Sequence, residues 1–103
     1  DRRMTQLEIQ LEHRCVTRIY GLGGMALKLE LSRMRGFPDR TILMPGAKVW
    51  FAEFKRIKSG RISIQQVVWQ ERLLSLGFGF YFINNDEQFE IALAKETAVA
   101  QEV

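Results

Sequence analysis

The chain has 103 residues, of which 47% are hydrophobic and 26% charged, a balance that excludes a disordered chain and fits a globular protein. Its net charge of +3 is uneven: residues 1–61 hold thirteen Lys or Arg against six Asp or Glu, whereas residues 62–103 hold two against six. The basic part suggests an anionic partner, most often nucleic acid. The alternative is that these basic residues lie on a solvated surface and cluster there by chance.

The length predicts a single domain, residues 1–103, with one core. No apolar run approaches the roughly 20 residues of a membrane helix, and the polar first residues are unlike a signal peptide, so we expect no membrane partner. A single cysteine cannot form an internal disulfide, which favours a reducing, cytoplasmic location.

Hydrophobic periodicity predicts the order helix, three strands, helix, strand, helix, an α/β fold with a mixed central sheet flanked by helices. The predicted elements are a helix at 4–20, strands at 25–31, 39–44 and 48–56, a helix at 63–76, a strand at 78–83 and a helix from 86 to about 100. The short turn at 45–48 predicts that the second and third strands pair antiparallel.

Periodicity also predicts which residues face the core. In the first helix, Leu7, Leu11, Cys15 and Ile19 recur every four positions and form an apolar stripe. In the first strand and the last helix, the predicted inward residues are Met25, Leu27, Leu29 and Leu31, and Phe89 and Leu93 with Ile91 as a further candidate. Both tryptophans and the aromatic run at 78–82 are expected in the core rather than as base-stacking platforms.

The third strand ends in an acid and a base that share one face. Side chains two apart in a strand point the same way, so Glu53 and Lys55 emerge together after the apolar run at 49–52. One explanation is a surface ion pair at a strand end, worth less than about 1 kcal/mol. The other is a site for a hard divalent cation such as magnesium, which prefers carboxylate oxygens and water.

A second carboxylate is predicted beside the first. In simple hairpin register about the turn at 45–48, Asp39 falls opposite residues 52–53, so it lies close to Glu53. Two like charges at that distance are unfavourable unless a cation lies between them. The alternative is that Asp39 only caps its loop, since Pro-Asp is common turn chemistry.

The two helices supply three further candidates. At 100° per residue Glu8 falls inside the apolar stripe of the first helix and Glu12 at its margin, so Glu8 is expected to face the sheet unless it reaches solvent near the helix start. Ser63 and Gln66 fit a capping box, which is at least as good an explanation for Gln66 as a role in catalysis. His13 and Cys15 are single residues of their kinds, which argues against a zinc site or a Cys-His pair.

Taken in order, these pieces are a helix glutamate, G-x-P-D at 36–39, E-x-K at 53–55, S-x-x-Q-x-x-W at 63–69 and L-x-x-L-G at 73–77. Over roughly residues 5–84 the chain resembles the PD-(D/E)XK nuclease superfamily, and within it the VRR-NUC (virus-type replication-repair nuclease) domain, especially small stand-alone phage versions. The resemblance implies a restriction-endonuclease-like αβββαβ core followed by a C-terminal helix. It also implies the interior of a host cell as the location, if the protein is phage-encoded.

The resemblance further implies a metal-dependent DNA endonuclease with Mg²⁺ or Mn²⁺ as cofactor, similar to homodimeric Holliday junction resolvases. Asp39 and Glu53 match the metal-binding carboxylates, Lys55 the catalytic lysine and Gln66 a supporting residue, while Glu8, or alternatively Glu12, matches the first-helix acid. The residues expected to contact the DNA backbone are Lys28, Arg33, Arg35, Arg40, Lys58 and Arg61. The alternatives are a non-catalytic DNA-binding module with this fold, and a flap or nicking nuclease that acts as a monomer.

Overall fold

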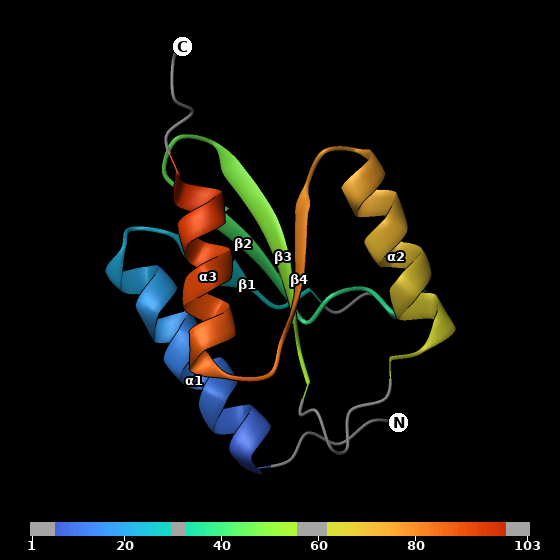
Figure 1. Cartoon of the computed structure of the whole chain (residues 1–103), viewed down its shortest axis with the longest axis horizontal. Coiled ribbons are helices and arrows are strands. Elements are labelled where there is room, and N and C mark those ends of the chain that lie inside the picture. The colour runs from blue at the N-terminus through green and yellow to red at the C-terminus, as the bar shows by residue number, and fades with distance from the viewer. Residues whose placement is uncertain (1–5, 30–32, 56–61, 99–103) are drawn as a thin grey trace.

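The structure is a computed structural model that describes residues 6–29, 33–55 and 62–98 (Figure 1). Its elements are α1 (Gln6–Gly21), β1 (Met25–Leu27), β2 (Arg40–Met44), β3 (Lys48–Phe54), α2 (Ile64–Ser75), β4 (Gly79–Ile83) and α3 (Asp86–Thr97). The predicted order of helices and strands is therefore confirmed. None of the helices in these described ranges combines the length and the apolar composition needed to cross a bilayer.

The four strands form one mixed sheet in the order β1-β2-β3-β4. The two pairs β1–β2 and β2–β3 are antiparallel, as predicted for the second, and β3 pairs parallel with β4. In the β2–β3 hairpin Arg40 lies opposite Ala52, so the preceding residue, Asp39, meets Glu53. The short turn thus sets the register that brings the two carboxylates together.

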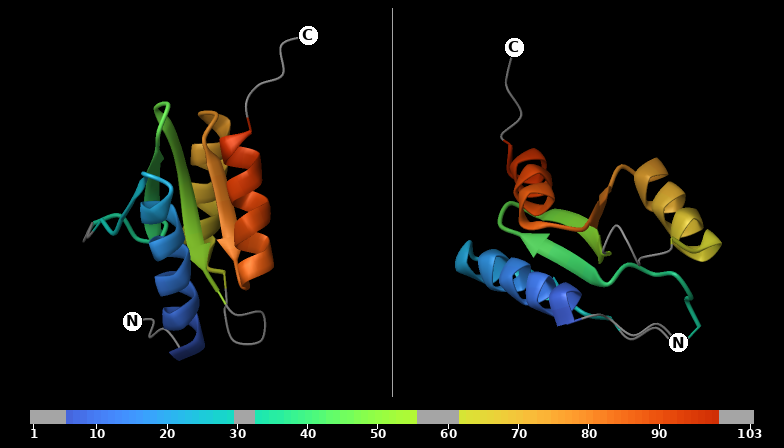
Figure 2. Two further views of the ribbon diagram at one scale, coloured as in Figure 1. Left: turned by 90° about the vertical axis from the view of Figure 1, so that its left-hand side faces the viewer. Right: turned by 60° about the horizontal axis from the view of Figure 1, so that its bottom comes forward.

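Helices cover both faces of the sheet: α1 and α3 lie side by side on one face, and α2 lies on the other (Figures 1 and 2). Successive side chains of β3 point to opposite faces of the sheet, so the strand contributes to the core on each face. Trp50, Ala52 and Phe54 belong to the larger core cluster, under α1 and α3. Val49 and Phe51 belong to a smaller, aromatic cluster under α2. Glu53 and Lys55 continue the α2-facing row.

The stripe of α1 begins one turn later than predicted. Leu11, Cys15 and Ile19 are buried, but Leu7 is 54% exposed. Burial raises the pKa of the Cys15 thiol to about 12, with the nearby Asp86 carboxylate adding to the shift. This cysteine is therefore a core residue with no accessible thiolate at neutral pH.

The predicted buried face of the first strand is wrong. The strand ends at Leu27, and within it Ala26 is buried while Met25 is 47% exposed; Leu29, beyond the strand, is also exposed. Ala26 lies opposite Ile42, whose side chain is 1% exposed, and residues opposite each other in a ladder share a face. Alternation defines two faces, but the partner strand decides which one is buried. Leu31 lies outside the described residues.

The last helix confirms two of its three predicted core residues. Phe89 and Leu93 are buried, and the third position of the stripe is Ala92, not Ile91, which is 51% exposed. Ile91 is two residues from Phe89, about 200° around the helix, so it points to the opposite side. The helix ends at Thr97, and the predicted extension toward residue 100 runs outside the described residues.

Candidate active site

Backbone amides of the facing segment hold both the Asp39 and the Glu53 carboxylate. The Asp39 amide donates a hydrogen bond to Glu53 Oε1 at 3.1 Å, and Asp39 Oδ2 accepts one from the Phe54 amide at 2.8 Å. Each carboxylate is therefore oriented by the strand that carries the other. The predicted proximity of the two acids is confirmed, and the Asp39 side chain bonds across to β3 rather than only capping its own loop.

Gln66 combines the two roles that the sequence left open. Its side-chain oxygen accepts a hydrogen bond from the Ser63 backbone N–H at 2.9 Å. Its backbone N–H donates to Ser63 Oγ at 3.2 Å, which completes the capping box of α2. Its Nε2 donates to Glu53 Oε2 at 2.7 Å. The start of α2 is thus tied directly to the end of β3.

Glu53 and Lys55 are buried side chains, only 2% and 6% exposed, so the alternative of a surface ion pair is wrong. The Lys55 amide donates to the Ile83 carbonyl at 2.9 Å, which extends the β3–β4 pairing past the end of the strand. Burying charged groups costs free energy unless they are paired and hydrogen-bonded. Glu53 has such partners in the Asp39 amide and in Gln66 Nε2.

The two acids of α1 differ in their partners. Both are buried, Glu8 at 3% and Glu12 at 5% exposed, so the idea that Glu8 reaches solvent is wrong. Glu12 Oε2 accepts from Arg40 Nε at 2.5 Å, and Arg40 also donates to the Ala26 carbonyl at 3.0 Å. Glu12 is therefore neutralised by a fixed cation, which favours Glu8 as the first-helix acid. The helix begins at the end of the sheet where β3 ends (Figures 1 and 2).

The predicted convergence of three acids is not found in the part of the chain that the structure describes. No three Asp, Glu, His or Cys side chains there form a group that could hold a metal ion. What the structure brings together is the pair Asp39 and Glu53, with Gln66 on one side of it. Two carboxylates are a sufficient protein contribution for magnesium, which keeps several waters and takes further oxygens from substrate phosphate. The residues present therefore fit this ion.

The loop before Asp39 is docked on α2, a contact that the sequence reasoning missed. Gly36 has φ +83°, and a Cβ there would lie 2.5–2.7 Å from atoms of Gln65 and Gln66, so only glycine fits. Trp69 Nε1 donates to the Arg35 carbonyl at 3.0 Å, and the Phe37 ring packs edge-on against Trp69. Gly36 in the G-x-P-D motif was the available signal.

The predicted backbone-contacting residues fall into three groups. Lys28, Arg33 and Arg35 are exposed, on the described segments before and after residues 30–32. Arg40 is held by Glu12, so a contact with DNA would require it to exchange that partner. Lys58 and Arg61 lie outside the described residues, and all six assignments stay predictions.

Comparison with known proteins identifies the fold. Among solved structures, one titled "VRR_NUC domain" superposes with a TM-score of 0.79 at 22% sequence identity, over 91% of this chain and 100% of that one. No family model and no curated protein matches the sequence. The mixed sheet flanked by helices is thus a restriction-endonuclease-like fold. More narrowly, it is the VRR-NUC fold, as the sequence motifs predicted.

Proposed function

We propose that the protein is a metal-dependent endonuclease that hydrolyses phosphodiester bonds in DNA. The observation that carries this proposal is that backbone amides fix the Asp39 and Glu53 carboxylates close together, with a buried Lys55 two residues after Glu53, on a fold shared with a VRR-NUC domain. Two fixed carboxylates and an amine at a sheet end fit phosphoryl chemistry better than a purely structural role, because a packed apolar group would be at least as stabilising there.

Asp39 and Glu53 would hold the ion. When bound, Mg²⁺ or Mn²⁺ supplies a water of lowered pKa and withdraws charge from the scissile phosphate. Gln66 keeps the Glu53 carboxylate in one orientation through its 2.7 Å hydrogen bond, and the capping box in turn fixes Gln66. Glu8 would act through a water, consistent with the absence of a three-acid group among the described residues.

Lys55 would act on the substrate rather than on the ion. It follows Glu53 by two positions, on the same side of the strand, and its side chain is 6% exposed. An ammonium group in a water-poor site stabilises charge that builds up on a phosphate far more than it would in water. Lys55 would therefore orient the attacking water or offset the charge of the transition state.

The preferred substrate in this proposal is a branched DNA such as a four-way junction, cut by a homodimer. This part derives from the resemblance stated above, since two copies of one site can cut two strands symmetrically. A side-by-side assay of a four-way junction, a flap and a plain duplex, with Mg²⁺ or Mn²⁺, tests it together with the mass of the protein in solution. Preferred cutting of the flap by a monomer would favour the alternative nuclease specificity.

The catalytic assignment is tested with Glu53→Gln and Lys55→Met, against Glu87→Gln and Lys95→Met as controls on α3. Each site variant is expected to lose cleavage by at least about 100-fold, while DNA binding in Ca²⁺ or EDTA is retained. The controls change the same groups at exposed positions and are expected to cut like the wild type. Full cleavage by either site variant would overturn the assignment.

A second candidate is a DNA-binding module of this fold without catalysis, in which Asp39 and the buried Glu53 and Gln66 serve only to join β3 to its neighbours. Calorimetric titration with Mn²⁺ separates the two. The nuclease predicts binding that Glu53→Gln weakens, whereas the module predicts no heat of binding in either protein.

A further inference from the structure

A shallow groove beside α2 has no assigned role. It has a volume of about 200 Å³ and lies between α2 and the docked loop before Asp39. Its lining residues are Arg35, Ile64, Gln65, Val68, Trp69 and Arg72. It is distinct from the carboxylate site, since it contains neither Asp39 nor Glu53, but it is built from the same two segments.

The groove is positively charged. Its lining contains two arginines and no acid. Across the described ranges, neither guanidinium has an ion-pair partner, unlike Arg14, Arg18 and Arg40. Arg72 is one of only two basic residues in the acidic stretch 62–103, so its presence here runs against the local charge balance.

The Trp69 ring contacts both arginines of the groove, one through its guanidinium and the other through its backbone. The Arg72 guanidinium lies over the Trp69 ring, 5.7 Å from its centroid, a cation–π contact that uses none of its N–H donors. The Trp69 indole N–H bonds to the Arg35 carbonyl, which fixes the backbone that carries the second guanidinium. A guanidinium held in this way, with a second arginine in the lining of the same groove, suits a phosphate group, whose oxygens accept paired hydrogen bonds.

The groove is rigidly connected to the carboxylate site. Gln65 lines the groove, and the next residue, Gln66, donates to Glu53. On the other wall, Arg35 precedes Asp39 by four residues, and the close approach of Gly36 to α2 keeps that loop in place. A strand held in the groove would therefore be held in register with the carboxylates.

We propose that this groove binds a phosphodiester of the DNA strand beside the one that is cut, with Arg35 and Arg72 as its two contacts. The inference deepens the proposed nuclease function and rests on it for the identity of the strand. The exposed apolar side chains of Ile64 and Val68 extend the groove with a surface that suits a sugar or base rather than a free inorganic anion.

The test is DNA binding at a series of salt concentrations, in EDTA so that no cutting occurs. Arg72→Gln is compared with the wild type and with Lys95→Gln, which removes the other basic residue of this part of the chain. Loss of one phosphate contact is expected to weaken binding and to lower the slope of log K against log salt by about one. Arg72→Lys keeps the positive charge but loses the paired donors of the guanidinium. It is expected to show the wild-type salt dependence but only part of the wild-type affinity.

A second measurement uses tryptophan fluorescence of the wild-type protein. Trp50 is fully buried, so a change on adding DNA reports mainly on Trp69. If Arg72→Gln has the same salt dependence as the wild type and wild-type fluorescence does not change on adding DNA, the groove does not bind DNA, even if the wild type cuts it. A lowered slope without any cutting by the wild type would keep the groove and reject the nuclease. A change in the protein's mass in solution on Arg72→Gln, without DNA, would assign the groove to a protein interface and reject the proposal.

Discussion

The two faces of the sheet are built differently. The face under α1 and α3 carries the larger core, with Trp50, Phe54 and Ile83 almost completely buried. The face under α2 carries a small aromatic cluster around Phe51, several of whose rings are only partly covered. Yet the carboxylates, Gln66 and the arginine groove all depend on the α2 side. The first face supplies most of the stability, and the second supplies most of the proposed chemistry, to which α1 adds Glu8.

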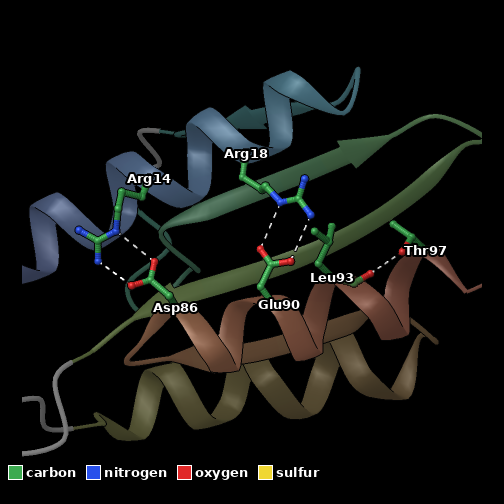
Figure 3. A network of polar contacts seen from close by, with 6 residues as sticks. All are labelled: Arg14, Arg18, Asp86, Glu90, Leu93 and Thr97. Atoms are coloured by element: carbon green, nitrogen blue, oxygen red, sulfur yellow. Dashed lines mark hydrogen bonds and ion pairs between the residues drawn. The ribbon is translucent and has the colours of Figure 1, made fainter.

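Two exposed ion pairs join α1 to α3 at the edge of the larger core (Figure 3). Arg14 on α1 pairs with Asp86 at the start of α3 at 2.8 Å, and Arg18 pairs with Glu90 one turn further on. Both pairs are about half exposed. Such pairs align the two helices and add little free energy, because water screens them. The stability of the face under α1 and α3 therefore comes from packing rather than from these ion pairs.

The largest effect on stability is expected from Trp50→Ala. Removing this fully buried ring should lower the free energy of unfolding by about 3–5 kcal/mol. On the other face Phe37→Ala, at a half-buried ring packed on Phe51 and Trp69, should cost less but should reduce cleavage more at equal folded fraction. Urea unfolding measures the loss of stability in both variants, and cleavage rates measure the loss of activity. Equal losses of stability in the two variants would contradict the difference between the two faces.

The next effect concerns the docked loop. Gly36→Ala places a Cβ against α2 and also strains a positive φ, so it should cost about 1–3 kcal/mol and lower cleavage at least tenfold. Gly46→Ala is the matched control, since Gly46 has the same φ of +83° but nothing within 4 Å of a Cβ. It should show only the cost of the strained backbone and retain cleavage. Equal losses of activity would mean that the docking does not position the site.

Removing the helix caps compares the two sides directly. Ser63 caps α2 and Asn85 caps α3, each accepting from the backbone amide three residues on. Replacement of either residue by alanine should cost about 1 kcal/mol, seen as a lower unfolding midpoint. Only Ser63→Ala should also slow cleavage, because Gln66 then loses part of its anchor beside Glu53. A similar slowing by Asn85→Ala would contradict the separation of roles.

The smallest effect is a pH dependence at the edge of the larger core. The hydrogen bond from the Arg14 guanidinium lowers the pKa of the Asp86 carboxyl below its ordinary value of 3.8. A lowered folded-state pKa contributes stability above pH 3.8, which is lost as the pH falls through the folded-state value. Arg14→Gln should therefore remove this small stabilisation at pH 7 and leave the stability below the folded-state pKa unchanged, which flattens the acid limb of the stability curve. Salt should act in the same direction on the wild type. An unchanged acid limb would show that this pair has no role.

The parts of the site that the sequence could predict are those set by local geometry. A short turn fixes hairpin register, so the pairing of Asp39 with Glu53 followed from counting residues, and helical spacing was enough to place Glu8 on the buried side. The contact of Glu12 with Arg40 spans 28 positions in the chain and depends on how α1 settles on the sheet. The docking of Gly36 on α2 has the same origin, because no local pattern records which helix a loop will meet.

A crystal structure grown with Mn²⁺ is the direct test of whether Asp39 and Glu53 together hold a divalent ion near Lys55. We expect an anomalous peak about 2.1 Å from an oxygen of each carboxylate, the spacing of a hard octahedral ion, and loss of that peak in Glu53→Gln. A wild-type crystal in which both carboxylates bond only to backbone amides and Gln66, with no ion near either, would contradict this assignment.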